Sequence, residues 1–179
     1  MDTFTLAATS FIIALSLFII GKKDPLQTAF ISLCLAVFVT EVGVFFHDIF
    51  AAVFWKKIEY LGTVAIAPCA LWFFRRLTHN RSIPTQGLIV FSVFLSAVGA
   101  FALFTPAARW SHFNSFVLVY TYASLALCYV ALVRYVKKLP PSVEKKRLGY
   151  MLFACPSAVI IGNIDLLNYF GFGLASLSG

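Results

Sequence analysis

Two lysines and a glutamate lie at the start of an apolar stretch in the first half of the chain. Residues 54–62 read Phe-Trp-Lys-Lys-Ile-Glu-Tyr-Leu-Gly, and apolar residues continue from there to position 72. Ammonium, carboxylate and phenol groups so close together bind small polar molecules through ion pairs and hydrogen bonds. Lys57, Glu59 and Tyr60 are therefore candidate members of a ligand-binding site.

Further polar side chains within apolar segments fall at the same depth. Glu41 lies in segment 26–54, and Asn163 and Asp165 lie in segment 148–170. If both segments are helices, a rise of about 1.5 Å per residue places Glu41 about 22 Å, and Asp165 about 27 Å, from the more basic ends of their helices. The candidate ligand-binding residues of this level are Glu41, Lys57, Glu59, Tyr60, Asn163 and Asp165.

Three interpretations of this polar level are open. It is an outward-facing pocket for a small ligand, or a set of polar pairs that hold helices together. In the third interpretation Glu59 and Asp165 lie in the solvated headgroup layer. Ionisable side chains inside a membrane are costly, and for that reason they are first considered as functional sites.

The chain carries no pattern typical of catalysis or of metal binding. It has no serine, histidine and acid at one depth, no glycine-rich phosphate loop and no His-Glu-x-x-His motif. Each of its four cysteines lies in a separate apolar segment, where a single thiol behaves as a small hydrophobic group. We expect no catalytic residue, no disulfide, no metal and no cofactor. The cysteines are Cys34, Cys69, Cys128 and Cys155.

The composition determines the class of protein that must position these side chains. Apolar residues make up 61% and charged residues 12% of the 179 residues, and the mean hydropathy is +0.91. Soluble domains are only about half apolar and about a quarter charged. We therefore predict an all-α, polytopic membrane helix bundle. The net charge of +7 is then a property of the loops, and no nucleic-acid partner is expected.

The apolar segments predict six membrane-spanning helices in a single domain over residues 1–179. Segment 49–55 is expected to be an interfacial turn or helix that follows the second span. No lysine or arginine precedes the first segment and two lysines follow it, which is the reverse of the charge order in a cleaved signal peptide. The expected spans are 4–20, 26–47, 57–74, 86–105, 113–134 and 148–170.

The basic residues predict the orientation of the bundle. With six spans, eleven lysines and arginines fall on one side and three on the other. Short cytoplasmic loops carry an excess of such residues. We therefore expect a multi-pass membrane protein with its N-terminus outside and with loops 21–25, 75–84 and 135–147 in the cytoplasm.

Two motifs resemble a known family. Residues 55–62 read Trp-Lys-Lys-Ile-Glu-Tyr-Leu-Gly and are followed by Pro68 and by the aromatic run Leu-Trp-Phe-Phe at 71–74. Residues 162–168 read Gly-Asn-Ile-Asp-Leu-Leu-Asn and follow a segment that begins in a basic loop. Together, over nearly the whole chain, these elements resemble the N-terminal seven-helix sensor region of bacterial histidine kinases.

The resemblance implies a sensor module of the bacterial inner membrane whose seventh helix feeds an output domain. We expect the chain to end at Gly179 before that helix, so no kinase activity is expected of these residues. The alternative functions are an accessory subunit of a larger membrane complex and, ranked last, a transporter or membrane enzyme. The expected partners are the lipid bilayer, a small ligand from outside or from the membrane, and a second copy or neighbouring membrane subunits.

Overall fold

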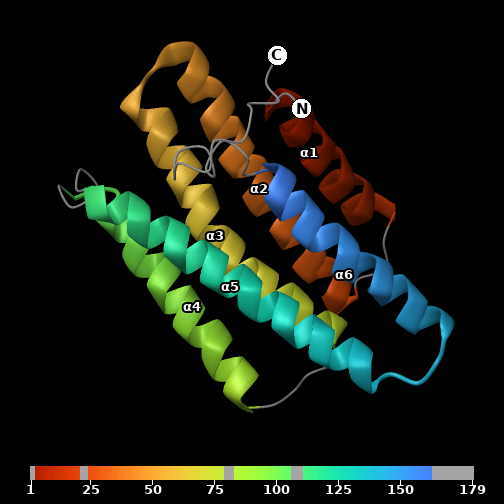
Figure 1. Cartoon of the computed structure of the whole chain (residues 1–179). Coiled ribbons are helices and arrows are strands. Elements are labelled where there is room, and N and C mark those ends of the chain that lie inside the picture. The colour runs from red at the N-terminus through yellow and green to blue at the C-terminus, as the bar shows by residue number, and fades with distance from the viewer. Residues whose placement is uncertain (1–2, 21–23, 79–82, 106–110, 163–179) are drawn as a thin grey trace. The chain divides into compact units, whose positions relative to one another are not determined.

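The computed structural model describes residues 3–20, 24–78, 83–105 and 111–162 (Figure 1). Within these ranges the chain forms six helices and no strand, which confirms the all-α fold. The helices are α1 (Thr3–Ile20), α2 (Pro25–Phe50), α3 (Val53–Leu77), α4 (Ile83–Ala102), α5 (Ser111–Lys138) and α6 (Val143–Gly162).

Four of the described helices are long and apolar enough to cross a membrane. They are α1, α2, α3 and, in α5, the stretch Ser115–Lys138. Each has at least the 18 residues that are needed for a hydrocarbon core of about 30 Å. A shorter apolar stretch, Gln86–Ala102, makes up most of α4.

The chain divides into two compact units, Met1–Cys128 and Tyr129–Gly179. The expectation of one domain over 1–179 stays a prediction. In the first unit α1 and α2 are antiparallel neighbours, since the Phe4 and Phe45 rings lie 5.4 Å apart and the Phe11 and Phe38 rings 4.9 Å apart. Both helices carry small buried residues, which are the type that lets membrane helices approach their neighbours closely. They are Ala7, Ser10 and Ala14 on α1, and Ala29, Ala36 and Gly43 on α2.

Helix α3 packs against α2, α4 and α5 within the first unit, and these helices lie around it in Figure 1. It runs antiparallel to α2, with the rings of Phe30 and Phe73 5.3 Å apart. One buried cluster joins α3 to the end of α4 and to α5 through Val64, Leu103, Phe113 and Val117. A second cluster joins Ala70 and Leu71 of α3 to Cys128 of α5.

The connection between α2 and α3 is shorter than expected. Helix α2 continues to Phe50 and α3 begins at Val53, so segment 49–55 is turn and helix as expected, with the turn limited to residues 51–52. Its position at the membrane interface stays a prediction. Ala51 adopts the left-handed conformation with φ 50°, and its N–H donates to the carbonyl of His47 at 2.7 Å. This is a C-terminal helix cap that usually needs glycine, and the sequence Ala51-Ala52 gives no sign of it.

The second unit also differs from the expected boundaries. Helix α5 reaches Lys138 and α6 begins at Val143, so most of the predicted basic loop 135–147 is helical. The Ser142 hydroxyl oxygen accepts a hydrogen bond from the N–H of Lys145 at 3.1 Å, which caps the start of α6. The loop itself is residues 139–142, and Pro140-Pro141 within it separate the two helices.

Candidate functional site

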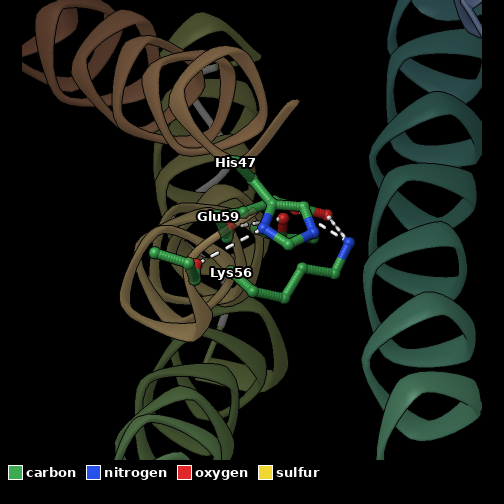
Figure 2. A network of polar contacts seen from close by, with 5 residues as sticks. His47, Lys56 and Glu59 are labelled. Atoms are coloured by element: carbon green, nitrogen blue, oxygen red, sulfur yellow. Dashed lines mark hydrogen bonds and ion pairs between the residues drawn. The ribbon is translucent and has the colours of Figure 1, made fainter. Parts of the chain in front are cut away.

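The turn between α2 and α3 brings the polar ends of these two helices together. Trp55 of α3 stacks on Phe46 of α2, with ring centroids 4.5 Å apart and planes 26° apart. His47 Nδ1 lies 3.4 Å from the carbonyl oxygen of Ala52. The aromatic contact and the cap at Ala51 therefore set the relative position of the side chains on each side of the turn. Figure 2 shows His47 of α2 together with Lys56 and Glu59 of α3.

Two glycines set the distance between α2 and α3 next to this turn. A methyl group on Gly43 of α2 would overlap the backbone nitrogen of Glu59 and lie 2.6 Å from its Cα. A methyl group on Gly62 of α3 would lie 2.5 Å from the backbone nitrogen of Thr40. Each helix thus presents a glycine to the backbone of the other, which is how membrane helices approach most closely. Glu59, one of the predicted ligand residues, lies at the centre of this contact.

Glu59 forms an ion pair with Lys56, one turn earlier on α3 (Figure 2). Lys56 Nζ lies 2.9 Å and 3.0 Å from the two carboxylate oxygens of Glu59. The Glu59 side chain is 17% exposed and that of Lys56 is 40% exposed. Lys56 therefore partly neutralises a carboxylate that is largely out of solvent. The Glu59 carbonyl accepts a further hydrogen bond from Thr63 Oγ1 at 2.8 Å.

Glu41 lies on α2, next to Thr40 at the glycine contact. Its carboxyl is half-buried and close enough to Glu59 for the two groups to interact electrostatically. Within the described residues Glu41 has no ion-pair partner, whereas Glu59 has Lys56. The structure thus brings together two of the predicted acids, which are 18 positions apart in the sequence, and pairs one of them.

The remaining predicted residues have separate surroundings. Lys56 Nζ lies 5.4 Å from the ring centroid of Tyr60, and this ring packs edge-on against Phe113 of α5 at 5.8 Å. Lys57 Nζ lies 5.5 Å from the ring centroid of Phe104, just after α4. The two lysine contacts are cation–π contacts. The Tyr60–Phe113 ring contact connects the polar level of α3 to α5, and the Lys57–Phe104 contact connects it to the residues that follow α4. Asn163 and Asp165 lie outside the described residues.

A buried group of hydroxyls was not predicted from the sequence. The hydroxyls of Ser92 and Ser96 of α4 each lie within hydrogen-bond distance of the Tyr120 hydroxyl of α5, and Ser96 donates to a backbone carbonyl of α3. The sequence signal was present, because two serines four positions apart share one face of an apolar helix. Their partners, however, lie on other helices.

An open depression of about 520 Å³ lies along α4. Its lining is almost entirely apolar and consists of Gln86, Gly87, Val90, Phe91 and Phe94. None of the predicted ligand residues contributes to it. In a membrane bundle such an exposed apolar face suits lipid chains.

The apolar helices, their small-residue contacts and the ionisable pair within them define a polytopic helical membrane protein. A family model described as the N-terminal 7TM region of histidine kinase matches residues 4–178. The chain therefore belongs to this family of membrane sensor regions, as its motifs indicated. No curated protein and no solved structure matches it.

Proposed function

We propose that the chain receives a signal for a bacterial sensor by binding a small ligand where α2 meets α3. The observation that carries this proposal is the unequal pairing of two neighbouring acids. Glu59 is paired with Lys56, whereas Glu41 has no ion-pair partner within the described residues. A carboxyl group in a membrane without a partner is costly, so a ligand with a cationic or hydrogen-bond-donating group would stabilise it. Membership of a sensor-region family supports the same role.

The proposed ligand acts on the packing of α2 against α3. Because Gly43 and Gly62 hold the two backbones in contact, a group bound beside Glu41 and Glu59 favours one separation of the helices over another. A ligand shifts such an equilibrium only by the difference between its affinities for the two packings. Lys57 and Tyr60 of α3 complete the proposed set of ligand residues within the described part of the chain, and Asn163 and Asp165 stay a prediction from the sequence.

We further propose that the protein lies in the inner membrane with its α2–α3 turn facing outward. Arg75 and Arg76 lie in the last turn of α3, at the opposite end from Lys56 and Lys57. The antiparallel order of α1, α2 and α3 supports an arrangement with segment 21–25 at the same end as these arginines. More basic residues at one end favour the cytoplasm for that end. In this arrangement Glu41 and Glu59 are reached from the periplasm or from the outer leaflet.

Thiol labelling of intact cells tests this orientation. We expect Val53→Cys to react with a membrane-impermeant maleimide in intact cells, and Arg76→Cys to react only after the membrane is disrupted. Both positions are exposed and both lie on α3, at opposite ends, so each serves as the control for the other. The reverse pattern would place the α2–α3 turn in the cytoplasm and would contradict the proposal.

Neutralising the two acids tests the ligand site. Glu41→Gln and Glu59→Gln are each expected to reduce the signal-dependent change in output at least tenfold, because a hydrogen bond to a charged group contributes about 1.5–3 kcal/mol. The measurement is the output of the full-length protein in its own cells, as a ratio between growth conditions that switch it on and off. Immunoblots of the membrane fraction correct for expression.

Asp48→Asn is the matched control, since Asp48 is an exposed acid near the same end of α2. It is expected to keep the full response. If all three variants respond like the unmodified protein at equal expression, Glu41 and Glu59 have a structural role and the proposed ligand site is wrong. Stoichiometric recovery of unrelated subunits after mild detergent extraction, with an unchanged response, would favour the accessory-subunit function instead.

A further inference from the structure

Pro68 leaves one backbone carbonyl of α3 without its usual donor. In an α-helix the N–H of residue 68 would donate to the carbonyl of Val64, four positions earlier, but proline has no N–H. Val64 itself is 2% exposed, and the carbonyl lies within an apolar helix where water is excluded. An unsatisfied carbonyl in this environment costs several kcal/mol. A donor from a neighbouring helix is one way to satisfy such a carbonyl.

Ser96 of α4 supplies that donor. Its hydroxyl donates to the Val64 carbonyl oxygen at 2.6 Å. A serine inside an apolar helix commonly donates instead to the carbonyl four positions earlier in its own helix, and for Ser96 this is the carbonyl of Ser92. Contacts of this own-helix kind are made in α1 and α2 by the hydroxyls of Thr9, Ser32 and Thr40. Ser96 is different.

Tyr120 of α5 explains the difference. Its hydroxyl donates to the Ser92 carbonyl at 2.8 Å, which is the acceptor that Ser96 would otherwise use. The same hydroxyl lies 2.6 Å from Ser92 Oγ and 2.9 Å from Ser96 Oγ. Tyr120 is 9% exposed and Ser92 3% exposed, so little solvent competes for these groups. Occupation of the Ser92 carbonyl by Tyr120 directs the Ser96 hydroxyl to Val64.

We propose that Ser96 and Tyr120 form a latch on the Val64 carbonyl that Pro68 leaves free, and that this latch holds α3 in one position against α4 and α5. In the closed state Ser96 donates to Val64 and Tyr120 donates to Ser92. In the open state Tyr120 withdraws, Ser96 donates to the Ser92 carbonyl of its own helix, and α3 is free to move about Pro68. The Ser96 hydroxyl has one hydrogen and two possible acceptors, the carbonyls of Val64 and Ser92. Which of the two accepts the hydrogen bond distinguishes the closed state from the open state.

The latch is placed to divide α3 into two arms. Lys56 and Glu59 lie on the arm before Val64, and Arg75 and Arg76 lie on the arm after Pro68. A second hydroxyl of α5, on Thr121, donates to the neighbouring carbonyl of Thr63 at 3.5 Å. Hydrogen bonds from α4 and α5 to two adjacent carbonyls, those of Val64 and Thr63, therefore oppose movement of the first arm. The latch does not depend on the ligand site; only its use in signalling rests on the proposed function.

A double-mutant cycle between Ser96→Ala and Pro68→Ala tests the chemistry. In the unmodified chain, Ser96→Ala is expected to raise the unfolding equilibrium constant about tenfold, which is near the upper range for hydrogen bonds between membrane helices. In the Pro68→Ala background residue 68 regains its N–H, so Ser96→Ala is expected to have less than about a threefold effect. The measurement is unfolding by SDS in dodecylmaltoside micelles, followed by helical circular dichroism.

Tyr120→Phe and Ser32→Ala complete the design. Tyr120→Phe frees the Ser92 carbonyl for Ser96. Its effect on the unfolding equilibrium constant is therefore expected not to add to the effect of Ser96→Ala. Ser32→Ala removes a hydroxyl that donates within its own helix at 3.0 Å, and is expected to change the constant by less than about twofold. An equal effect of Ser96→Ala with and without Pro68 would overturn the latch.

A distance measurement keeps the inference testable if a variant is too unstable to titrate. Spin labels at positions 53 and 76, both exposed on α3, report the distance between its two ends in a background without the native cysteines. We expect Ser96→Ala and Tyr120→Phe to broaden the distance distribution, and Pro68→Ala to narrow it. Distributions that are the same in all variants would show that nothing is released, and would overturn the latch. These readouts need no ligand, so they separate failure of the latch from failure of the proposed function.

Discussion

Gly43→Ala and Gly62→Ala are each expected to destabilise the protein by about 3 kcal/mol, because overpacking a tight contact costs about 1–3 kcal/mol and a clash with backbone lies at the upper end. The added methyl group would lie 2.6 Å from the Glu59 Cα in the first case and 2.5 Å from the Thr40 nitrogen in the second. No side-chain rotation relieves either contact. Helices α2 and α3 must therefore move apart.

Gly87→Ala and Gly149→Ala are the matched controls. Both glycines lie in helices and have nothing within 4 Å of the position of the added methyl group. They are expected to be neutral or to stabilise their helices by up to about 1 kcal/mol, since alanine is the better helix former. The measurement is the free energy of unfolding by SDS in mixed micelles. Equal stability of all four variants would show that α2 and α3 are not in backbone contact.

The same glycines connect stability to the proposed site. Glu59 and its partner Lys56 are carried by the backbone that Gly43 contacts. Separation of the helices therefore also moves Glu59 away from Glu41. We expect the two glycine variants to lose signal-dependent output together with stability, whereas the two controls keep both.

Leu103→Ala is expected to destabilise the protein by about 2–3 kcal/mol, whereas removal of the larger Phe101 side chain is expected to cost less than about 0.5 kcal/mol. Leu103 is 1% exposed and packs with Val64, Phe113 and Val117, while Phe101 is 74% exposed. In a membrane an exposed phenylalanine contacts lipid in both the folded and the unfolded state, so its loss changes folding little. The loss of Leu103 leaves a cavity between α3, α4 and α5.

Thermal unfolding of Leu103→Ala and Phe101→Ala in the same detergent measures this difference. The two residues are only two positions apart. The two variants therefore compare the buried side and the exposed side of the same short segment. A greater loss of stability for Phe101→Ala would mean that this face is covered by protein rather than by lipid. Such a result would also support a partner subunit on α4.

The membrane class, the all-helical fold and the family are determined by the sequence alone. They depend on composition, on the length of apolar runs and on short motifs, and these are properties of single segments. The ends of helices follow less closely from the sequence where the capping residue is not a typical one. Ala51 caps α2 in the left-handed conformation without the glycine or asparagine that marks such a cap, so the α2–α3 turn was placed too broadly.

The arrangement of the site was decided by tertiary structure. Glu41 and Glu59 were each recognised as unusual from their apolar surroundings, but only the antiparallel register of α2 and α3 brings them together. Pro68 was visible in the sequence as a helix breaker, whereas the groups that act on the carbonyl it frees come from α4 and α5. A sequence specifies which groups need a partner; the side chain that satisfies each one depends on how separate helices pack.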